Sequence, residues 1–199
     1  AQAENAAYTA AGLPLLDLHI RHKAFAGRTV LREVRLQLQV GEVVSLVGAS
    51  GCGKSTLLRL IAGLDREHDG DMTLAGVSLT GIHREIGLIF QEPRLLPWLT
   101  AEANLDFALQ SCKVPTARWE ELKSRYLAMA GLSEYRDYYP HQISGGMAQR
   151  LALVRALCVE PGILLMDEPF SGLDEITARR IRTDLLSIWR ETRKTIVFV

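Results

Sequence analysis

Apolar and polar residues alternate in two segments near the start of the chain. The first series is Leu16, Leu18 and Ile20, and the same two-residue period recurs at Val34, Leu36, Leu38 and Val40. A period of two places the apolar side chains on one face of an extended backbone. Both segments are therefore predicted to be half-buried strands.

Short apolar runs predict further strands. Val43–Val47 is predicted to be a buried strand, Ile86–Phe90 an apolar strand, Ile163–Met166 a second buried strand and Thr195–Val199 a further strand. Between the first two, the dipeptides Asp69-Gly70 and Ala75-Gly76 punctuate a short hairpin region. Uninterrupted apolar strands are typical of a parallel sheet.

Helical spacing dominates the second half of the chain. Residues 100–139 carry it at Leu122, Tyr126 and Leu127, with Pro115 as a break, and we interpret this stretch as a helical insertion. Further helices are predicted from Gly146 to about Cys158 and over Glu175–Arg193. Strands that alternate with helices indicate a mostly parallel sheet covered on both faces.

Length and composition limit the kinds of protein that this chain can be. A chain of 199 residues is most simply one domain with a subdomain, and its 23 basic and 23 acidic residues argue against a nucleic-acid partner. No apolar run is long enough to span a membrane. Residues 1–12 are Ala-rich and are predicted to be a mobile arm rather than a secretory signal. Three scattered cysteines fit free thiols in a reducing cytosol.

A phosphate-binding loop follows the first apolar run. It reads Gly48, Ala49, Ser50, Gly51, Cys52, Gly53, Lys54, Ser55 and Thr56, and fits the template G-x-x-x-x-G-K-[ST]. Its glycines let backbone N–H groups surround an anion, and a helix start adds partial positive charge. Lys54 would reach the outer phosphates and Ser55 would hold magnesium. A glycine-rich turn that binds nothing is the alternative, which the Lys-Ser pair and the flanking elements disfavour.

Two carboxylates end the strand Ile163–Met166. Ligands of parallel sheets sit at the carboxyl ends of strands, so Asp167 would face the loop and hold magnesium. Glu168 would orient and deprotonate an attacking water. A polar turn is the simpler interpretation of this pair alone, but the phosphate loop favours the functional one.

A second possible anion site begins at Ser144. The stretch Ser144, Gly145, Gly146 and Met147 offers a hydroxyl and exposed N–H groups at a helix start. A simple N-cap with a hinge is the alternative. One nucleotide does not need two cradles, so the second is predicted to serve the nucleotide of a partner.

With these motifs in this order, the chain resembles the ATP-binding subunits of ABC transporters from about Leu15 to Val199. Phe25 matches the aromatic residue that stacks on adenine, and Gln91 the Q-loop glutamine. The other matches are the Walker A loop (48–56), the signature (Ile143–Arg150), the Walker B strand (Leu164–Glu168) and the D-loop (Ser171–Asp174).

The resemblance implies an α/β P-loop NTPase fold of the RecA-like type, with an N-terminal antiparallel β subdomain and a helical subdomain at about 93–150. It also implies ATP and Mg²⁺ as ligands. Glu168, Lys54 and Gln91 would be catalytic, and Ser55, Gln91 and Asp167 would hold the metal. In a head-to-tail dimer, Ser144, Gly145, Gly146, Met147 and Asp174 would act on the nucleotide of the other subunit.

The implied partners are a second copy or a paralogous ATPase subunit, transmembrane permease subunits and, indirectly, a periplasmic or lipoprotein solute-binding protein. The implied location is peripheral, on the cytoplasmic face of the cell membrane. The ATP-binding domain is expected over residues 13–199, with its C-terminal part, including the switch histidine, expected after Val199. Ile143 and Met147 replace the common Leu and Gln of the signature.

The segment Phe90–Thr100 is similar to bacterial importers of nitrate, sulfonates and taurine, and Asp167–Ser171 also resembles importers. The alternatives are an efflux or lipoprotein-release ATPase, a non-transport ABC ATPase, and a nucleotide-gated module without catalysis. The motifs do not identify the solute.

Three single residues have two interpretations each. Phe25 is either a core aromatic or the adenine platform, and Trp98 either packs internally, which we favour, or anchors a permease. Cys52 is either a small loop filler or a reactive helix-start thiol. The histidines show no ligand spacing, so no metal other than magnesium is expected.

Overall fold

The computed structural model describes residues 13–170, 175, 178–179, 182–183 and 194–199. The chain divides into two compact units, which are described separately. The first unit comprises residues 1–86, 162–167 and 194–199, and the second comprises residues 87–161 and 168–193.

An antiparallel sheet opens the first unit. Its strands are β1 (Leu16–Phe25), β2 (Arg28–Leu38), β4 (Asp69–Leu74) and β5 (Val77–Ser78), in the order β2-β1-β4-β5. Leu16, Leu18 and Ile20 are buried, which confirms the predicted alternation. Asp69-Gly70 lies inside β4 rather than in a turn. A Cβ at Gly70 would lie 2.3 Å from the carbonyl oxygen of His19, so a glycine is needed at this point of the pairing between β1 and β4.

Three parallel strands also belong to this unit, β3 (Val43–Ser45), β8 (Thr195–Phe198) and β7 (Ile163–Met166). The strand order is β3-β8-β7-β6, in which β6 (Ile86–Ile89) lies mostly in the residues of the second unit. All four residues of β7 are buried, as predicted. The strand predicted at Val43–Val47 is present at Val43–Ser45, but the prediction that it is buried is wrong for the described residues. Among these, β3 pairs with β8 alone, and Val43 and Val47 are 43% and 91% exposed.

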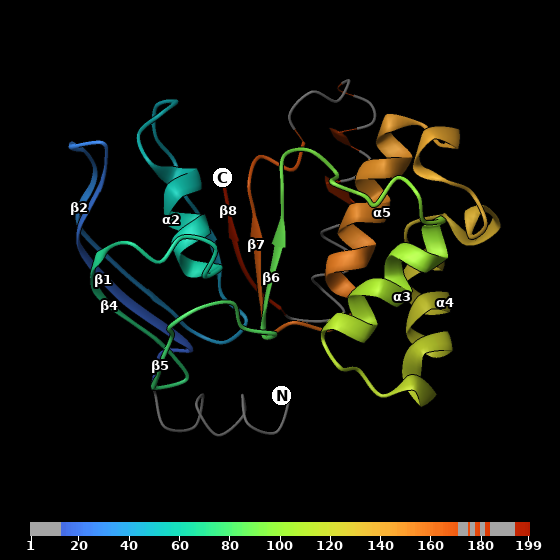
Figure 1. The fold of residues 1–199 in the computed structure, drawn as a ribbon, viewed down its shortest axis with the longest axis horizontal. Helices are drawn as coiled ribbons and strands as arrows, with labels where there is room; N and C mark the ends of the chain where they lie inside the picture. Colours follow the sequence, from blue (N-terminus) through green and yellow to red (C-terminus); the bar gives the residue numbers. More distant parts are fainter. Residues whose placement is uncertain (1–12, 171–174, 176–177, 180–181, 184–193) are drawn as a thin grey trace. The chain divides into compact units, whose positions relative to one another are not determined.

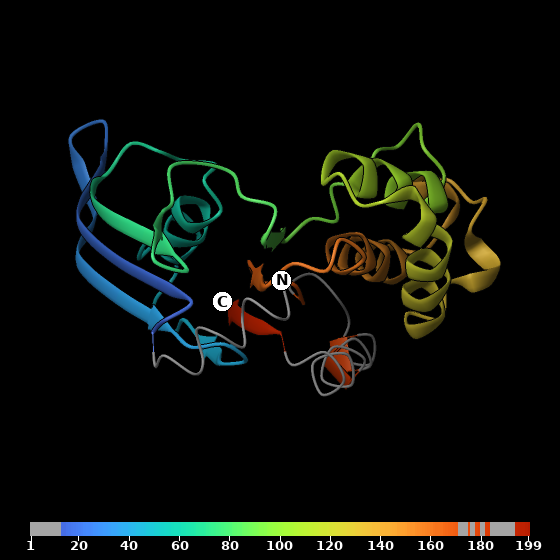
Figure 2. The same ribbon diagram turned by 90° about the horizontal axis from the view of Figure 1, so that it is seen from below.

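Helix α2 (Lys54–Ile61) lies between these two sheets (Figures 1 and 2). Its buried residues are Leu57, Leu58, Leu60 and Ile61, whose spacing gives the helix apolar contacts on more than one side. The helix therefore fixes the phosphate loop before it against the core of the first unit.

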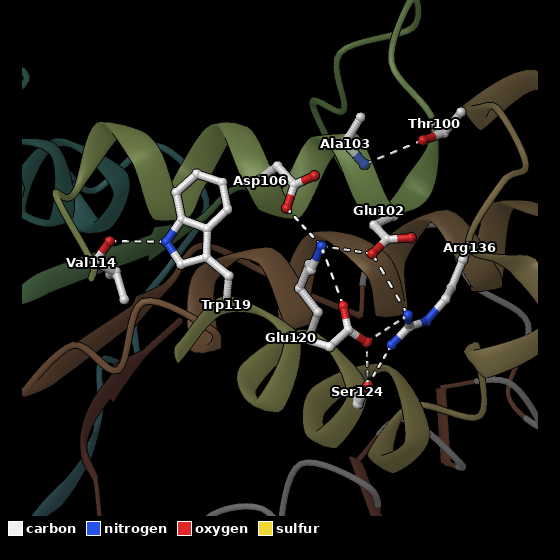
Figure 3. A network of polar contacts seen from close by, with 10 residues as sticks. Thr100, Glu102, Ala103, Asp106, Val114, Trp119, Glu120, Ser124 and Arg136 are labelled. Carbon is white, nitrogen blue, oxygen red and sulfur yellow. Dashed lines mark hydrogen bonds and ion pairs between the residues drawn. The ribbon is translucent and has the colours of Figure 1, made fainter. Parts of the chain in front are cut away.

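Over residues 87–161, the second unit contains the helices that the spacing predicted. They are α3 (Ala101–Ser111), α4 (Trp119–Met129) and α5 (Gly145–Leu157), with short 3-10 helices at Thr116–Arg118, Ser133–Tyr135 and Pro140–Gln142. Leu122, Tyr126 and Leu127 face the core of this unit. Pro115 ends the segment between α3 and α4, and the indole N–H of Trp119 donates to the Val114 carbonyl at 2.9 Å (Figure 3).

A polar network joins α3 to α4. Lys123 Nζ lies 2.6 Å from Glu102 Oε1 and 3.0 Å from Asp106 Oδ1, and Arg136 donates to Glu120 at 2.8 Å. Figure 3 shows these carboxylates converging from both helices. The Asp106 contact is an ion pair without hydrogen-bond geometry.

The predicted helix at Glu175–Arg193 lies largely outside the described residues, although Glu175, Ala178, Arg179, Arg182 and Thr183 are helical. Within the described residues, no helix is both long and apolar enough to cross a membrane.

Candidate nucleotide-binding site

The phosphate loop joins β3 to α2. Gly53 is the residue before the helix and has a φ of +101°. A Cβ at Gly53 would lie 2.7 Å from Cδ2 of Leu31, so both the backbone conformation and the space require glycine. Helix α2 therefore starts next to the loop, with the unpaired N–H groups of its first turn available to an anion.

The side chain of Lys54 folds back onto the start of the phosphate loop. Its Nζ donates to the carbonyl oxygens of Gly48 and Ala49, at 2.9 Å each, and lies 3.9 Å from Cys52 Sγ. The ammonium group is thus held on the same side as the loop backbone, where it would meet the phosphates. Cys52 is exposed, so the small-filler interpretation and the reactive-thiol interpretation both remain.

Ser55 and Asp167 come together although 112 residues separate them. The Ser55 hydroxyl donates to Asp167 Oδ1 at 2.7 Å. Because β7 lies two strands from β3 in the parallel sheet, the end of β7 brings Asp167 to the start of α2. Hydroxyl and carboxylate oxygens are the donors that Mg²⁺ prefers, so the pair fits the predicted metal site.

Glu168 follows Asp167 in an unusual backbone conformation. It is exposed and has a φ of +46°, in the left-handed region that non-glycine residues seldom occupy. Such backbone strain is found preferentially at functional sites. The turn is held by Gln149, whose amide donates to the Pro169 carbonyl at 2.9 Å from a side chain that is only 5% exposed.

The second predicted cradle forms a regular helix start. Ser144 is the N-cap of α5, and its hydroxyl accepts from the Met147 N–H at 3.2 Å. A Cβ at Gly145 would meet nothing within 4 Å, so the space beside this turn is open. The N-cap interpretation is therefore correct in itself, and the proposed action on a second nucleotide stays a prediction.

Gln91 is exposed and follows β6. The next residues are anchored by α5, because Arg155 donates to the carbonyls of Arg94 at 2.8 Å and Pro93 at 3.0 Å. Burial lowers the pKa of Arg155. Trp98 is 70% exposed, so our expectation that it packs internally is wrong. The carbonyls around it are occupied by Asn104 and Arg155, and this tight loop leaves the indole outside.

The adenine interpretation of Phe25 gains support because the residue is 48% exposed and is not a core aromatic. Phe25, the loop 48–56 and Asp167 belong to the first unit, whereas Gln91, Ser144–Met147 and Glu168 belong to the second. Asp174 and the rest of the D-loop lie outside the described residues.

Sequence reasoning missed the roles of three polar residues. Lys23 and Asp65 belong to no motif, and Gln149 lies within the signature (Ile143–Arg150) but was given no role of its own. Only the structure reveals that Gln149 and Lys23 are buried. The sequence offered no signal for Lys23, because the alternation of Leu16, Leu18 and Ile20 assigns the odd-numbered positions to the outer face of the strand.

Comparison with known proteins agrees with the family resemblance inferred from the motifs. The family model described as ABC transporter matches residues 31–171. The chain is 48% identical over 185 residues to the aliphatic sulfonates import ATP-binding protein SsuB 1 of Xanthomonas axonopodis pv. citri (strain 306), covering 92% of this chain and 73% of that protein. It is 44% identical over 190 residues to SsuB of Bacillus subtilis (strain 168), covering 92% and 72%.

A solved structure has the same fold. The structure of cbiO1 from Clostridium perfringens, part of the ABC transporter complex cbiONQ, matches with a TM-score of 0.81 and 24% identity. The match covers 93% of this chain and 77% of that one. This confirms the predicted P-loop fold class.

Proposed function

Because the chain belongs to the ABC transporter family, we propose that it is the ATP-binding and ATP-hydrolysing subunit of a solute importer with a separate membrane permease. The observation that carries this proposal is the hydrogen bond of 2.7 Å between Ser55 and Asp167. It joins the phosphate loop to the Walker B strand, the two parts that phosphoryl transfer requires in this class.

The first unit binds the nucleotide. The N–H groups of residues 48–56 surround the β- and γ-phosphates, and Lys54 exchanges its contacts with the Gly48 and Ala49 carbonyls for phosphate oxygens. Phe25 stacks on the adenine. Ser55 and Asp167, with Gln91 of the second unit, would hold Mg²⁺, which would neutralise the charge that develops on the phosphates.

Glu168 activates water. Its carboxylate accepts a proton from the attacking water while the phosphates are held in place. Gln91 links the metal site to the helical subdomain at about 93–150, within an ATP-binding domain over residues 13–199. Through this subdomain the hydrolysis cycle is passed to the permease.

The active form is a head-to-tail dimer with a second copy or a paralogous subunit. Ser144, Gly145, Gly146 and Met147 of one subunit bind the γ-phosphate held by the other, and Asp174 couples the two sites. The regular N-cap of α5 supports this role, because a helix start can bind an anion and a Cβ added at Gly145 would meet nothing within 4 Å.

The transported solute is proposed to be an aliphatic sulfonate, since the relatives named above import that class. The subunit would lie peripherally on the cytoplasmic face of the cell membrane, with a solute-binding protein on the other side. No described contact favours efflux, lipoprotein release or a non-transport role.

Hydrolysis is tested by Glu168→Gln. We expect this variant to bind ATP like the wild type and to lose about 100-fold or more of the hydrolysis rate, because only the base is removed. Equilibrium dialysis with ATP and phosphate release measure the two quantities. Glu121→Gln, the same change on the exposed side of α4, is the matched control and should leave both unchanged. Normal turnover in Glu168→Gln would overturn the assignment of the base.

The solute class is tested separately. The chain and its permease are expressed in a bacterium that lacks its own sulfonate importer, with an alkanesulfonate as the sole sulfur source. Growth that depends on Lys54 supports the proposal. Active ATP hydrolysis without growth would contradict the sulfonate assignment and leave the ATPase assignment intact.

A further inference from the structure

A lysine is buried beside the proposed adenine platform. The Lys23 residue is 1% exposed, which is rare for lysine unless its charge is paired. No motif of the family resemblance includes it. Burial of the Lys23 ammonium group costs desolvation free energy, so its surroundings must compensate for that cost.

The register of β1 explains how Lys23 comes to be buried. The buried residues of the strand are Leu16, Leu18 and Ile20, and the pairing with β4 then shifts between Ile20 and His22. The shift moves the inward-facing set from even to odd positions, so Lys23 points inward. Phe25 lies two residues further along, and alternation places it on the same side as Lys23.

Asp65 pairs with the lysine. The distance from Lys23 Nζ to Asp65 Oδ1 is 2.8 Å, and the Asp65 side chain is 19% exposed. Burial acts to raise the pKa of Asp65, but the hydrogen bonds from Lys23 and from the Glu67 N–H outweigh it, and the pKa lies below its usual value. The aspartate is therefore ionised at neutral pH and holds the ammonium group in place.

This pair connects the base platform to the phosphate loop. Asp65 lies just beyond the C-terminal end of α2, where its N–H donates to the Arg59 carbonyl at 3.3 Å. The same helix begins with Lys54 and Ser55. The strand that carries Phe25 is thus tied through one ion pair to the helix that carries the loop.

The ammonium group also lies against the ring of Phe25. Lys23 Nζ is 4.4 Å from the ring centroid, within the range of a cation–π interaction. The residue is still 48% exposed, so much of the phenyl group stays open. A cation on one face draws π electrons toward it and leaves the opposite face less negative, which favours stacking of an electron-rich base such as adenine.

We propose that Lys23, held by Asp65, is a positioning residue for adenine recognition: its ammonium group fixes and polarises the Phe25 ring from beneath, so that the open face binds the base. This inference rests on the proposed role of Phe25 as the adenine platform. Lys23 does not contact the nucleotide itself. Its effect should therefore appear in binding of the base and not in binding of the phosphates.

The test compares two ligands that share phosphates but not the base. The dissociation constants of ATP and of inorganic tripolyphosphate are measured for the wild type and for Lys23→Met, which keeps the length of the side chain but removes its charge. We expect affinity for ATP to fall about three- to tenfold and affinity for tripolyphosphate to stay unchanged. Equal ratios in wild type and variant would overturn the proposal.

Two controls make the result decisive. Lys123→Met removes the other buried lysine and should leave the ratio of the two affinities unchanged. Phe25→Ala should lower the ratio at least as much as Lys23→Met. If Phe25→Ala leaves the ratio unchanged, the proposed platform is wrong. If only Phe25→Ala lowers it, the platform stands and the role of Lys23 is refuted.

A charge-neutral variant guards against misfolding. If Lys23→Met does not fold, the double change Lys23→Met with Asp65→Asn removes the pair without leaving a buried orphan carboxylate. Its ratio of ATP to tripolyphosphate affinity should fall as for the single variant, and an unchanged ratio would contradict the proposal.

Discussion

Each of the two units has a nearly fully buried lysine, and the two lysines have different surroundings. Lys123 in the helical unit is 8% exposed and lies near three carboxylates, Glu102, Asp106 and Glu120. Lys23 in the first unit is 1% exposed and has one carboxylate, Asp65, and one aromatic ring, Phe25.

The different surroundings indicate different roles: Lys123 stabilises the packing of two helices, and Lys23 positions an aromatic ring. The partners of Lys123 come from α3 and α4, with Glu102 and Asp106 one helical turn apart, so the network ties one helix to the other (Figure 3). Lys23 instead connects a strand, the segment after α2 and an exposed ring. We infer that loss of Lys123 affects mainly stability, whereas loss of Lys23 also affects ligand binding.

The largest effect is expected from Lys123→Met. Removing the cation leaves three clustered carboxylates, two of them partly buried, and should lower the free energy of unfolding by about 3 kcal/mol. Urea unfolding followed by circular dichroism measures it. Glu121→Gln on the same helix, away from the network, should cost little. A cost no larger than that of Glu121→Gln would break the comparison.

The next effect is the coupling between Lys23 and Asp65. Each single change, Lys23→Met or Asp65→Asn, leaves one charge without its partner, so the double change should cost less than the sum of the single ones by about 1–2 kcal/mol. A double-mutant cycle in urea gives this value. Strict additivity would mean that the ion pair of 2.8 Å contributes nothing.

A smaller effect on stability is expected from a change at Gln149. This variant also tests whether the helical unit positions Glu168, the proposed catalytic base. Gln149→Leu leaves the Pro169 carbonyl without its donor and should cost about 1 kcal/mol of stability. The turn after Glu168 would loosen, so the hydrolysis rate should fall while ATP affinity holds. Hydrolysis at the wild-type rate would confine Gln149 to a structural role.

The smallest effect is the pH dependence of the stability that each ion pair contributes. It follows from the pKa of Asp65 for one pair and from the pKa of Lys123 for the other. The pKa of Asp65 is lowered, so the contribution of its pair is complete above about pH 4 and is lost as pH falls through the folded value. Burial acts to lower the pKa of Lys123, but Glu102 and Asp106 raise it overall. Its contribution is complete below about pH 10 and is lost as pH rises through the folded value.

These directions are checked by unfolding in urea across pH. The difference in stability between wild type and the Lys23→Met, Asp65→Asn double variant should shrink in acid. The difference between wild type and Lys123→Met should shrink in strong alkali, where Lys123 loses its proton, and also in acid, where its carboxylate partners gain protons. A Lys123→Met difference that persists unchanged in strong alkali, or a Lys23 and Asp65 difference that persists unchanged in acid, would show that the partners are assigned wrongly.

The sequence predicted those parts of the fold that depend on short-range patterns. Alternation located β1 and β2, the apolar run located β7, and the loop template located the start of α2. It failed where tertiary position decides. Val43–Val47 is apolar, but among the described residues β3 pairs with one strand only and is not buried. Trp98 is large and apolar but lies outside a tight loop.

The candidate site was predictable to the same extent. Residues with motif chemistry, such as Lys54, Ser55 and Asp167, were found because their spacing is fixed by the loop and the strand. Lys23 and Asp65 were missed, and so was the structural role of Gln149 within the signature, because these roles depend on a register shift or on contacts between distant segments. No local pattern encodes such contacts.

The most direct test of the account is the rate of MgATP hydrolysis per subunit, measured over a range of protein concentrations. The proposed site needs Lys54 and Glu168 of one subunit and Ser144 of another. The rate per subunit should therefore rise steeply with concentration for the wild type and stay near zero for Glu168→Gln. A rate that is independent of concentration, with ATP fully bound, would contradict a site shared between two subunits.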